Sequence, residues 1–233
     1  MCTVTFIAKR NDDFILTSNR DEIPDRKTLS PQEYIEENVK LVYPKDQVAG
    51  GTWIGVSDRN RVINLLNGGF EPHKRKDYYR MSRGVVVKQL LTAEDAVLKI
   101  KEFDFMDIEP FTIILVDWNS SLKLYRLVWD GVKKHFIKLN LGNHIWSSSP
   151  LYSPEMKAKR QQWLSEFIEN NVTSAESLLE FHHNAGEGNM EIDLQMNRGF
   201  IKTVSITQIE KKNNQVKMTY KDLNSGESNR IEI

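Results

Sequence analysis

The chain has 233 residues, with 32 Lys and Arg balanced by 32 Asp and Glu. Hydrophobic residues make up 39% and charged residues 27%, which is typical of a folded globular protein and excludes an intrinsically disordered one. A neutral chain has no global field that would attract nucleic acid or an anionic membrane, and one cysteine excludes an intramolecular disulfide framework or a cysteine-rich zinc site.

The first third of the chain is predicted to form two β-hairpins separated by a long loop. Asn11-Asp12-Asp13 and Asp58-Arg59-Asn60 supply the turns. The polar segment 22–47 contains three prolines, so we interpret it as an irregular loop over the mouth of a pocket. The expected strands cover residues 3–8, 14–19, 52–57 and 61–66.

The rest of the chain alternates between helices and strands. Capping patterns predict helices over 82–91, from Thr92-x-x-Asp95 to about 103, from Ser153-Pro154 to about 170, and from Thr173-x-x-Glu176 to about 183. Strands are expected over residues 111–118, 122–129, 134–139, 144–148, 200–209, 215–221 and 229–233.

This order of elements predicts the fold class. Strands joined by tight turns make mostly antiparallel sheets, and two helix pairs must each cover a sheet face. We therefore expect an α+β fold in which two stacked sheets lie between helical layers, a four-layer α-β-β-α sandwich in one domain over residues 1–233. A two-layer α+β fold is the alternative.

Cys2 is the first candidate for chemistry. A small residue after Met1 permits removal of the methionine, which would place the Cys2 thiol beside its own α-amino group. That amine, with an ordinary pKa of about 7.7–8.0, can act as a base, so nucleophile and base would come from one residue. The alternative interpretation is a small, inert cysteine that begins a strand.

Three further motifs contain polar residues or glycines at strand ends. Asn19-Arg20-Asp21-Glu22 ends the strand that pairs with the Cys2 strand, so Arg20 can lower the pKa of a thiol and Asp21 can hold an α-ammonium group. Gly50-Gly51-Thr52-Trp53 permits a close backbone approach with a Trp beside it, and Asn67-Gly68-Gly69 can present an amide to an oxyanion. Each motif alone also fits an ordinary turn.

Together these motifs resemble the NRDE family, also called the transport and Golgi organisation protein 2 family. The resemblance rests on Met1-Cys2, Asn19-Arg20-Asp21-Glu22, Gly50-Gly51-Thr52-Trp53-Ile54-Gly55 and Asn67, in this order over about 70 residues. It implies a fold similar to that of the N-terminal nucleophile hydrolases with an N-terminal Cys, such as penicillin V acylases and bile salt hydrolases.

The resemblance also implies residue roles. Cys2 matches the nucleophile, Arg20 and Asp21 match its supporting residues, and Asn67 matches an asparagine on the oxyanion side. Ser148 stands where an Asn is expected, and Lys202 where members often have an Arg. We assign substrate binding to Asn19, Gly51, Trp53, Ser148 and Lys202.

The predicted function is hydrolysis of a carbon–nitrogen amide bond by an N-terminal cysteine hydrolase. The alternative is a non-catalytic binding or trafficking protein for a hydrophobic ligand, an acyl lipid or haem. The expected partner is a small-molecule substrate or ligand, with no nucleic acid, no membrane span, no cofactor and no metal. A cytoplasmic location is expected from the single cysteine, and in the processed chain Arg20 should lower the pKa of Cys2.

Overall fold

The computed structural model describes residues 2–233, which divide into two compact units. The first unit contains the residues up to Arg26 together with Gly142–Ile233, and the second contains Lys27–Leu141. In sequence, the second unit is therefore inserted between two parts of the first. The expectation of a single domain over residues 1–233 stays a prediction.

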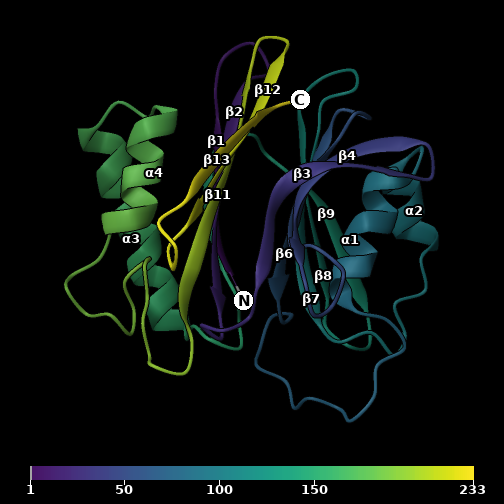
Figure 1. Ribbon diagram of the computed structural model, residues 1–233, viewed down its shortest axis with the longest axis horizontal. Helices are drawn as coiled ribbons and strands as arrows, with labels where there is room; N and C mark the ends of the chain where they lie inside the picture. Colours follow the sequence, from purple (N-terminus) through teal and green to yellow (C-terminus); the bar gives the residue numbers. More distant parts are fainter. Residues whose placement is uncertain (1) are drawn as a thin grey trace. The chain divides into compact units, whose positions relative to one another are not determined.

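Six antiparallel strands form the sheet of the first unit, in the order β10-β1-β2-β11-β12-β13 (Figure 1). Helices α3 and α4 lie along one face, where α3 contacts β10 and α4 contacts β2 and β11. The elements are β1 (Cys2–Ala8), β2 (Phe14–Glu22), β10 (Asn143–Ser147), α3 (Pro154–Asn170), α4 (Ala175–Asn184), β11 (Lys202–Lys212), β12 (Gln215–Asp222) and β13 (Ser228–Glu232).

An apolar core holds the helices to this sheet. Ile7 of β1 and Ile15 of β2 pack with Leu178 and Phe181 of α4 and with Leu164 of α3, and all five side chains are at most 4% exposed. Burial of such side chains contributes roughly 1.5–3 kcal/mol each. This burial holds α3 and α4 against one face of the sheet.

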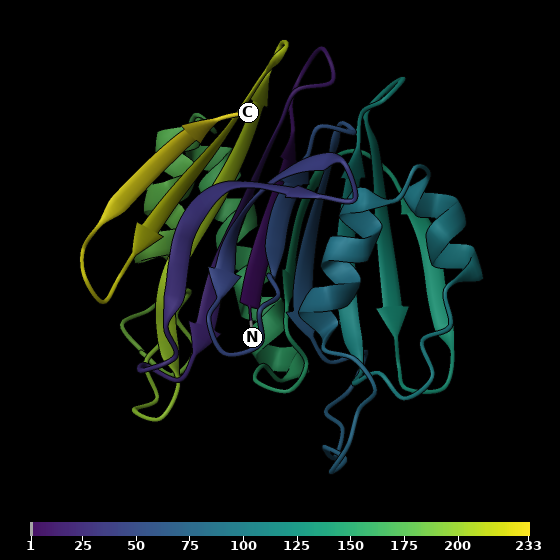
Figure 2. The same ribbon diagram turned by 45° about the vertical axis from the view of Figure 1, so that its right-hand side comes forward.

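Seven antiparallel strands form the sheet of the second unit, and they follow one another in chain order. Figure 2 shows α1 and α2 on one side of this sheet, and α1 contacts β5 and β6. The elements are β3 (Thr28–Glu36), β4 (Val39–Asp46), β5 (Ile54–Ser57), β6 (Arg61–Asn67), α1 (Arg83–Thr92), α2 (Ala96–Glu102), β7 (Phe111–Asp117), β8 (Lys123–Trp129) and β9 (Lys134–Leu139).

The buried side chain of Arg61 ties α1 to this sheet. Its Nη1 donates to the carbonyl oxygens of Leu90 and Ala93 at 3.1 and 2.6 Å, and its Nη2 donates to that of Glu94 at 2.9 Å. The last carbonyls of a helix lack partners within the helix. A strand side chain therefore satisfies the C-terminus of α1.

The interpretation of residues 22–47 as an irregular loop is wrong, because most of this segment forms the β3–β4 hairpin (Figure 2). Glu37 and Asn38 make the turn with φ of 51° and 60°. The two prolines that argued against strands are accommodated, since Pro31 lies in a register break of the edge strand β3 and Pro44 lies opposite that break.

Two helix starts also differ from the prediction. Asp95 rather than Thr92 caps α2, accepting from the backbone N–H groups of Val97 and Leu98. Ser174 rather than Thr173 caps α4, and the helix begins one residue later. Ser153 caps α3 with Pro154 following it, as predicted. Within residues 2–233, no helix is both long enough and apolar enough to cross a membrane.

Candidate functional site

The two faces of the first sheet are distinguished by the partners of their side chains. Thr3 of β1 bonds to Arg160 of α3, and Thr5 bonds to His182 of α4 at 2.8 Å. These threonines therefore face the helices. Because successive side chains of a strand point to opposite faces, Cys2 lies on the face away from the helices.

Cys2 begins a row of residues that crosses the sheet on this face. It pairs with Arg20 of β2, and Arg20 pairs on its other side with Ser205 of β11. A break in register between Thr203 and Ser205 sets Ser205 opposite Arg20. On the other side of Cys2, the backbone N–H of Ser148 donates to the Cys2 carbonyl oxygen at 3.0 Å. The predicted residues Cys2, Arg20 and Ser148 are thus neighbours.

The thiol of Cys2 is free and 2% exposed. Burial raises the pKa of the Cys2 thiol, Asp21 adds to this rise, and Arg20 opposes it. The lowered pKa was predicted for a chain from which Met1 has been removed, and Met1 itself lies outside the described residues. For the full-length chain the direction is the opposite, because removing a thiolate from water outweighs the attraction of one guanidinium.

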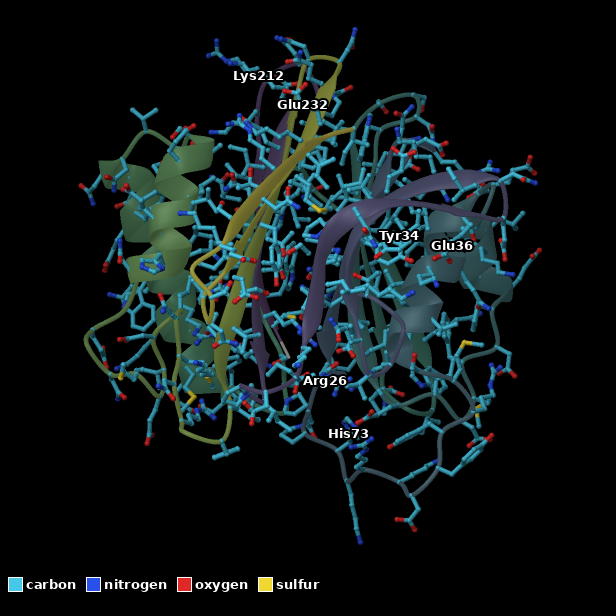
Figure 3. All side chains as sticks on the ribbon, in the orientation of Figure 1. Arg26, Tyr34, Glu36, His73, Lys212 and Glu232 are labelled. Atoms are coloured by element: carbon cyan, nitrogen blue, oxygen red, sulfur yellow. The ribbon has the colours of Figure 1, made fainter. Side chains whose placement is uncertain are left out.

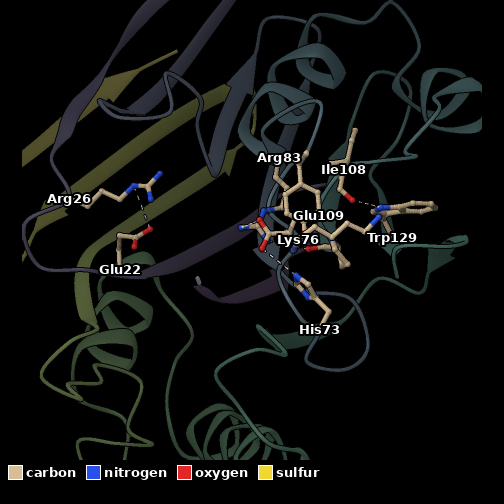
Figure 4. A network of polar contacts seen from close by, with 10 residues as sticks. Glu22, Arg26, His73, Lys76, Arg83, Ile108, Glu109 and Trp129 are labelled. Atoms are coloured by element: carbon tan, nitrogen blue, oxygen red, sulfur yellow. Dashed lines mark hydrogen bonds and ion pairs between the residues drawn. The ribbon is translucent and has the colours of Figure 1, made fainter.

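Arg20 belongs to a chain of charged side chains at the end of β2. Its Nη2 lies 3.9 Å from Glu22 Oε2, and Arg26 Nε lies 3.8 Å from the same oxygen (Figure 4). Lys202, at the start of β11, pairs with Glu22 in the sheet. Lys202 therefore lies at the same end of the sheet as Cys2, and its contact with a substrate stays a prediction.

Asp21 lies on the helix-facing side and is fully buried. The Tyr152 hydroxyl donates to its Oδ2 at 2.6 Å, and the Thr203 hydroxyl donates to its Oδ1 at 2.7 Å. Burial raises the pKa of the Asp21 carboxyl, while the charge of Arg160 and the two hydroxyls oppose the rise. The guanidinium of Arg160 stacks on the Tyr152 ring, 3.7 Å from its centre. These contacts fix the carboxyl beside the residue that pairs with Cys2.

The structure gives Asn19 a role other than the predicted substrate binding. Its Nδ2 donates to the carbonyl oxygens of His182 and Leu194 at 3.0 and 2.8 Å, and its Oδ1 lies 2.7 Å from His182 Nδ1. Burial lowers the pKa of His182 to about 3, so the ring is neutral and Nδ1 donates to Asn19. Asn19 holds α4 against β2 on the face opposite to Cys2.

Gly51, Trp53 and Asn67 belong to the second unit. Gly51 lies against Gly84 in the first turn of α1, where a Cβ on Gly51 would come within 2.8 Å of the Gly84 backbone. Trp53 is 6% exposed, and Asn67 is the half-buried last residue of β6. That these three residues share a pocket with Cys2 stays a prediction.

A polar cluster follows the end of β6. The Gly68 N–H donates to the Pro110 carbonyl oxygen at 2.9 Å. The carboxylate of the neighbouring Glu109 lies 3.2 Å from His73 Nε2 and 3.1 Å from Arg83 Nη2 (Figure 4). These contacts anchor the loop between β6 and α1.

Comparison with known proteins assigns the chain to a family. The family model described as Transport and Golgi organisation 2 matches residues 1–221. The chain belongs to this family. The recognition made from the four N-terminal motifs is therefore confirmed. No curated protein sequence matches the chain.

Solved structures show the fold of this family member. A variant of conjugated bile acid hydrolase from Clostridium perfringens is similar with a TM-score of 0.59 and 11% identity, covering 99% of this chain and 92% of that one. Penicillin V acylase from Agrobacterium tumefaciens gives 0.61 and 12%, covering 100% and 86%. A Caenorhabditis elegans orthologue of N-acylethanolamine-hydrolyzing acid amidase gives 0.60 and 10%, covering 89% and 92%.

These likenesses confirm the predicted fold class, the α-β-β-α sandwich of the N-terminal nucleophile hydrolases. At 10–12% identity they show the fold alone. Within residues 2–233, no group of three or more His, Cys, Asp or Glu side chains could hold a metal ion.

A cavity of about 630 Å³ in the first unit lies at the other end of β1 from Cys2. Its lining includes Lys9, Lys212 and Glu232, and the last two are labelled in Figure 3. The Lys9 ammonium donates to the carbonyl and hydroxyl oxygens of Thr173. This charged hollow is separate from the Cys2 row.

Sequence reasoning missed four residues around the site. Tyr152, Thr203 and Arg160 position Asp21, and Ser205 extends the Cys2 row. Thr203 and Ser205 belong to the segment Lys202-Thr203-Val204-Ser205, in which only Lys202 was assigned a role. The usable signal was the alternation of polar and apolar residues in 203–207, which marks Thr203 and Ser205 as strand residues with polar side chains.

Proposed function

We propose that the protein is an N-terminal cysteine hydrolase that cleaves a carbon–nitrogen amide bond, with Cys2 as nucleophile after removal of Met1. The observation that carries the proposal is the pairing of Cys2 with Arg20 at the start of β1, beside the buried Asp21. The N-terminal nucleophile hydrolase fold supports it, because the structural neighbours include proteins named as an acylase and hydrolases.

The proposed reaction has two halves. The Cys2 sulfur attacks the amide carbonyl carbon, and the thiol proton passes to the α-amino group of Cys2. The C–N bond then breaks, and the leaving amine takes that proton. Water attacks the resulting thioester, the C–S bond breaks, and the acid leaves while the thiol is restored.

The surrounding residues have proposed roles in these steps. Asp21 holds the α-ammonium group in place, and Arg20 stabilises negative charge on the sulfur. Asn67 and the Ser148 hydroxyl donate to the oxyanion. Ser148 has a buried hydroxyl, which makes it suited to this role. Asn19 is not included, because its amide is occupied by α4 and the following loop.

The test is accumulation of an acyl-enzyme. The processed protein is incubated with a panel of N-acyl amines, and the mass of its N-terminal peptide is followed together with amine release. A Cys2 acyl adduct and released amine, both lost in Cys2→Ala, are expected. Absence of both in a chain shown by mass to lack Met1 would refute the proposal.

One observation favours the alternative, a non-catalytic binding or trafficking protein for a hydrophobic ligand such as an acyl lipid or haem. The raised pKa keeps the Cys2 thiol neutral in a chain that retains Met1. A purified protein of full-length mass that binds an acyl lipid without turnover would support this alternative. The free cysteine is compatible with a proposed cytoplasmic location.

A further inference from the structure

Among the described residues of the first unit, 2–26 and 142–233, three buried hydroxyls have no hydrogen-bond partner. They are those of Ser148, Ser205 and Thr207, whose side chains are 1%, 1% and 0% exposed. An unsatisfied buried hydroxyl costs free energy, and native proteins seldom leave one without a protein, water or ligand partner. Such groups on one face of a sheet indicate that something else binds along that face.

All three hydroxyls lie on the Cys2 face of the sheet. Gln208 faces α4, since it donates to the Ala175 carbonyl oxygen at 2.9 Å. Its neighbour Thr207 must therefore face the other way, as must Ser205, three residues before Gln208. The same alternation applies to Ser148, because the preceding Ser147 bonds to Arg160 of α3.

The helix-facing side provides the contrast. There, Thr3, Thr5, Thr17 and Thr203 are buried to a similar degree, and each hydroxyl bonds to a named side chain. Unpartnered hydroxyls are therefore not a general property of this sheet. They are confined to the face that carries Cys2.

We infer that Ser205 and Thr207 bind an oxygen-bearing tail of the acyl group attached to Cys2, so that the substrate is a polar acyl amide rather than a plain hydrocarbon one. This inference rests on the proposed function. The acyl chain crosses β2 over Arg20 and reaches β11. Ser205 lies two strands from Cys2, which is about 10 Å at the usual strand spacing.

This separation fixes the length of the tail. A hydrogen bond to the Ser205 hydroxyl spans about 3 Å of the distance, which leaves roughly six bonds between the sulfur-bound carbon and the ligand oxygen. Thr207 lies about 7 Å further along β11 on the same face and can contact the same oxygen or a second one. Ser148, next to Cys2, is left for the carbonyl oxygen.

The experiment attaches alkyl thiols to Cys2 as mixed disulfides, so it does not require turnover of a substrate. The protein is equilibrated with equal amounts of 6-hydroxyhexanethiol and heptanethiol and their disulfides, and the mixed disulfides are quantified on the N-terminal peptide. The Cys2 thiolate attacks a disulfide sulfur, one thiolate leaves, and no net oxidation occurs. The two tails have nearly the same size, and urea-unfolded protein gives the intrinsic ratio.

The folded protein is expected to enrich the hydroxyl tail roughly fivefold over unfolded protein, the effect of about one hydrogen bond. Ser205→Ala or Thr207→Val should reduce the enrichment, and the double variant should abolish it. The matched control is Thr17→Val on the opposite face, which should leave the ratio unchanged. Equal ratios in the folded protein and the double variant, or no capture of either tail, would overturn the inference.

Thermal unfolding provides a second readout. Thr207→Val removes a hydroxyl without a partner, so its melting temperature should equal or exceed that of the wild type, whereas Thr17→Val breaks a bond to Gln208 and should lower it. A lowered melting temperature for Thr207→Val would mean that the Thr207 hydroxyl has a hydrogen-bond partner within the protein, and this would contradict the inference. If the proposed hydrolysis fails, the disulfide ratios are unaffected, so the two failures can be told apart.

Discussion

The hydroxyl of Tyr152 offers the sharpest test of how Asp21 is held. Tyr152→Phe removes the donor to Asp21 Oδ2 at 2.6 Å and keeps the ring on which Arg160 stacks. Tyr152 and Asp21 are 1% and 0% exposed, so water cannot replace the lost hydroxyl. The carboxyl would keep the Thr203 hydroxyl as its remaining side-chain donor among the bonds described above.

The expected cost follows from the charge of the acceptor. A hydrogen bond to a charged group contributes about 1.5–3 kcal/mol. In a chain of this size each kcal/mol lowers the melting temperature by roughly 2–4 °C, so Tyr152→Phe should lower it by roughly 3–12 °C. Urea unfolding at pH 7.5 measures the free energy directly.

The cost should depend on pH. Burial raises the pKa of Asp21 in the folded state above its unfolded value, so the folded state binds more protons in the window between the two values. Stability contributed by this group therefore falls as the pH rises through that window. Tyr152→Phe raises the folded pKa further, so its cost should be smaller at low pH, where the Asp21 carboxyl is protonated in both proteins, than at high pH, where it is ionised.

A double-mutant cycle separates the hydrogen bond from ring packing. In an Asp21→Asn background, Tyr152→Phe should cost less than about 1 kcal/mol, the worth of a neutral hydrogen bond. Tyr43→Phe is the matched control, because its hydroxyl donates to Glu36, a partly exposed carboxylate of the second unit labelled in Figure 3. An equal cost of Tyr152→Phe in both backgrounds and at low and high pH would refute the reasoning.

Three further outcomes are expected. His182 stays neutral when folded, with a pKa of about 3 against an ordinary 6.5, so protonation of the unfolded chain should remove roughly 2 kcal/mol of stability between pH 7.5 and pH 5. Urea unfolding of His182→Gln should show a weaker dependence of stability on pH. An unchanged pH dependence would contradict the assignment. Gly84→Ala should lower the melting temperature, because its Cβ would come within 2.9 Å of the Thr52 backbone nitrogen. Gly142→Ala is the control, because its Cβ would meet only His144 Nε2, at the ordinary contact distance of 3.8 Å, and equal melting temperatures for the two variants would contradict the close packing at Gly84. Iodoacetamide should alkylate Cys2 of the full-length chain with an apparent pKa above the ordinary thiol value, and a lowered pKa would show that burial does not dominate.

Local sequence signals predicted most elements because their causes are local. Ser153-Pro154 determines where α3 begins, through a side-chain cap and a residue that needs no N–H. The β3–β4 hairpin was missed because Pro31 and Pro44 count against strands. Only the register break opposite Pro44 makes both acceptable, and register is a property of two paired strands.

The site was predictable to the extent that one hairpin defines it. Cys2 and Arg20 pair because a single turn joins β1 and β2. The partners of Asp21 come from Tyr152 and Thr203, 131 and 182 residues further along the chain, and no local pattern relates them to Asp21. Asn19 and Arg20 are neighbours in one sequence motif, but successive side chains of a strand point to opposite faces, so Asn19 lies on the face away from Cys2.

The insertion of the second unit between Arg26 and Gly142 has a consequence for the order of events during synthesis. The second sheet joins strands that follow one another in the chain, so it can assemble as it emerges from the ribosome. Strand β2 must wait for β11, about 180 residues later. At about 5–20 residues per second, that delay is on the order of 10–40 s. Throughout it the Cys2 end of β1 lacks its finished sheet, so enzymes that act on nascent chains can reach a thiol that the completed protein buries.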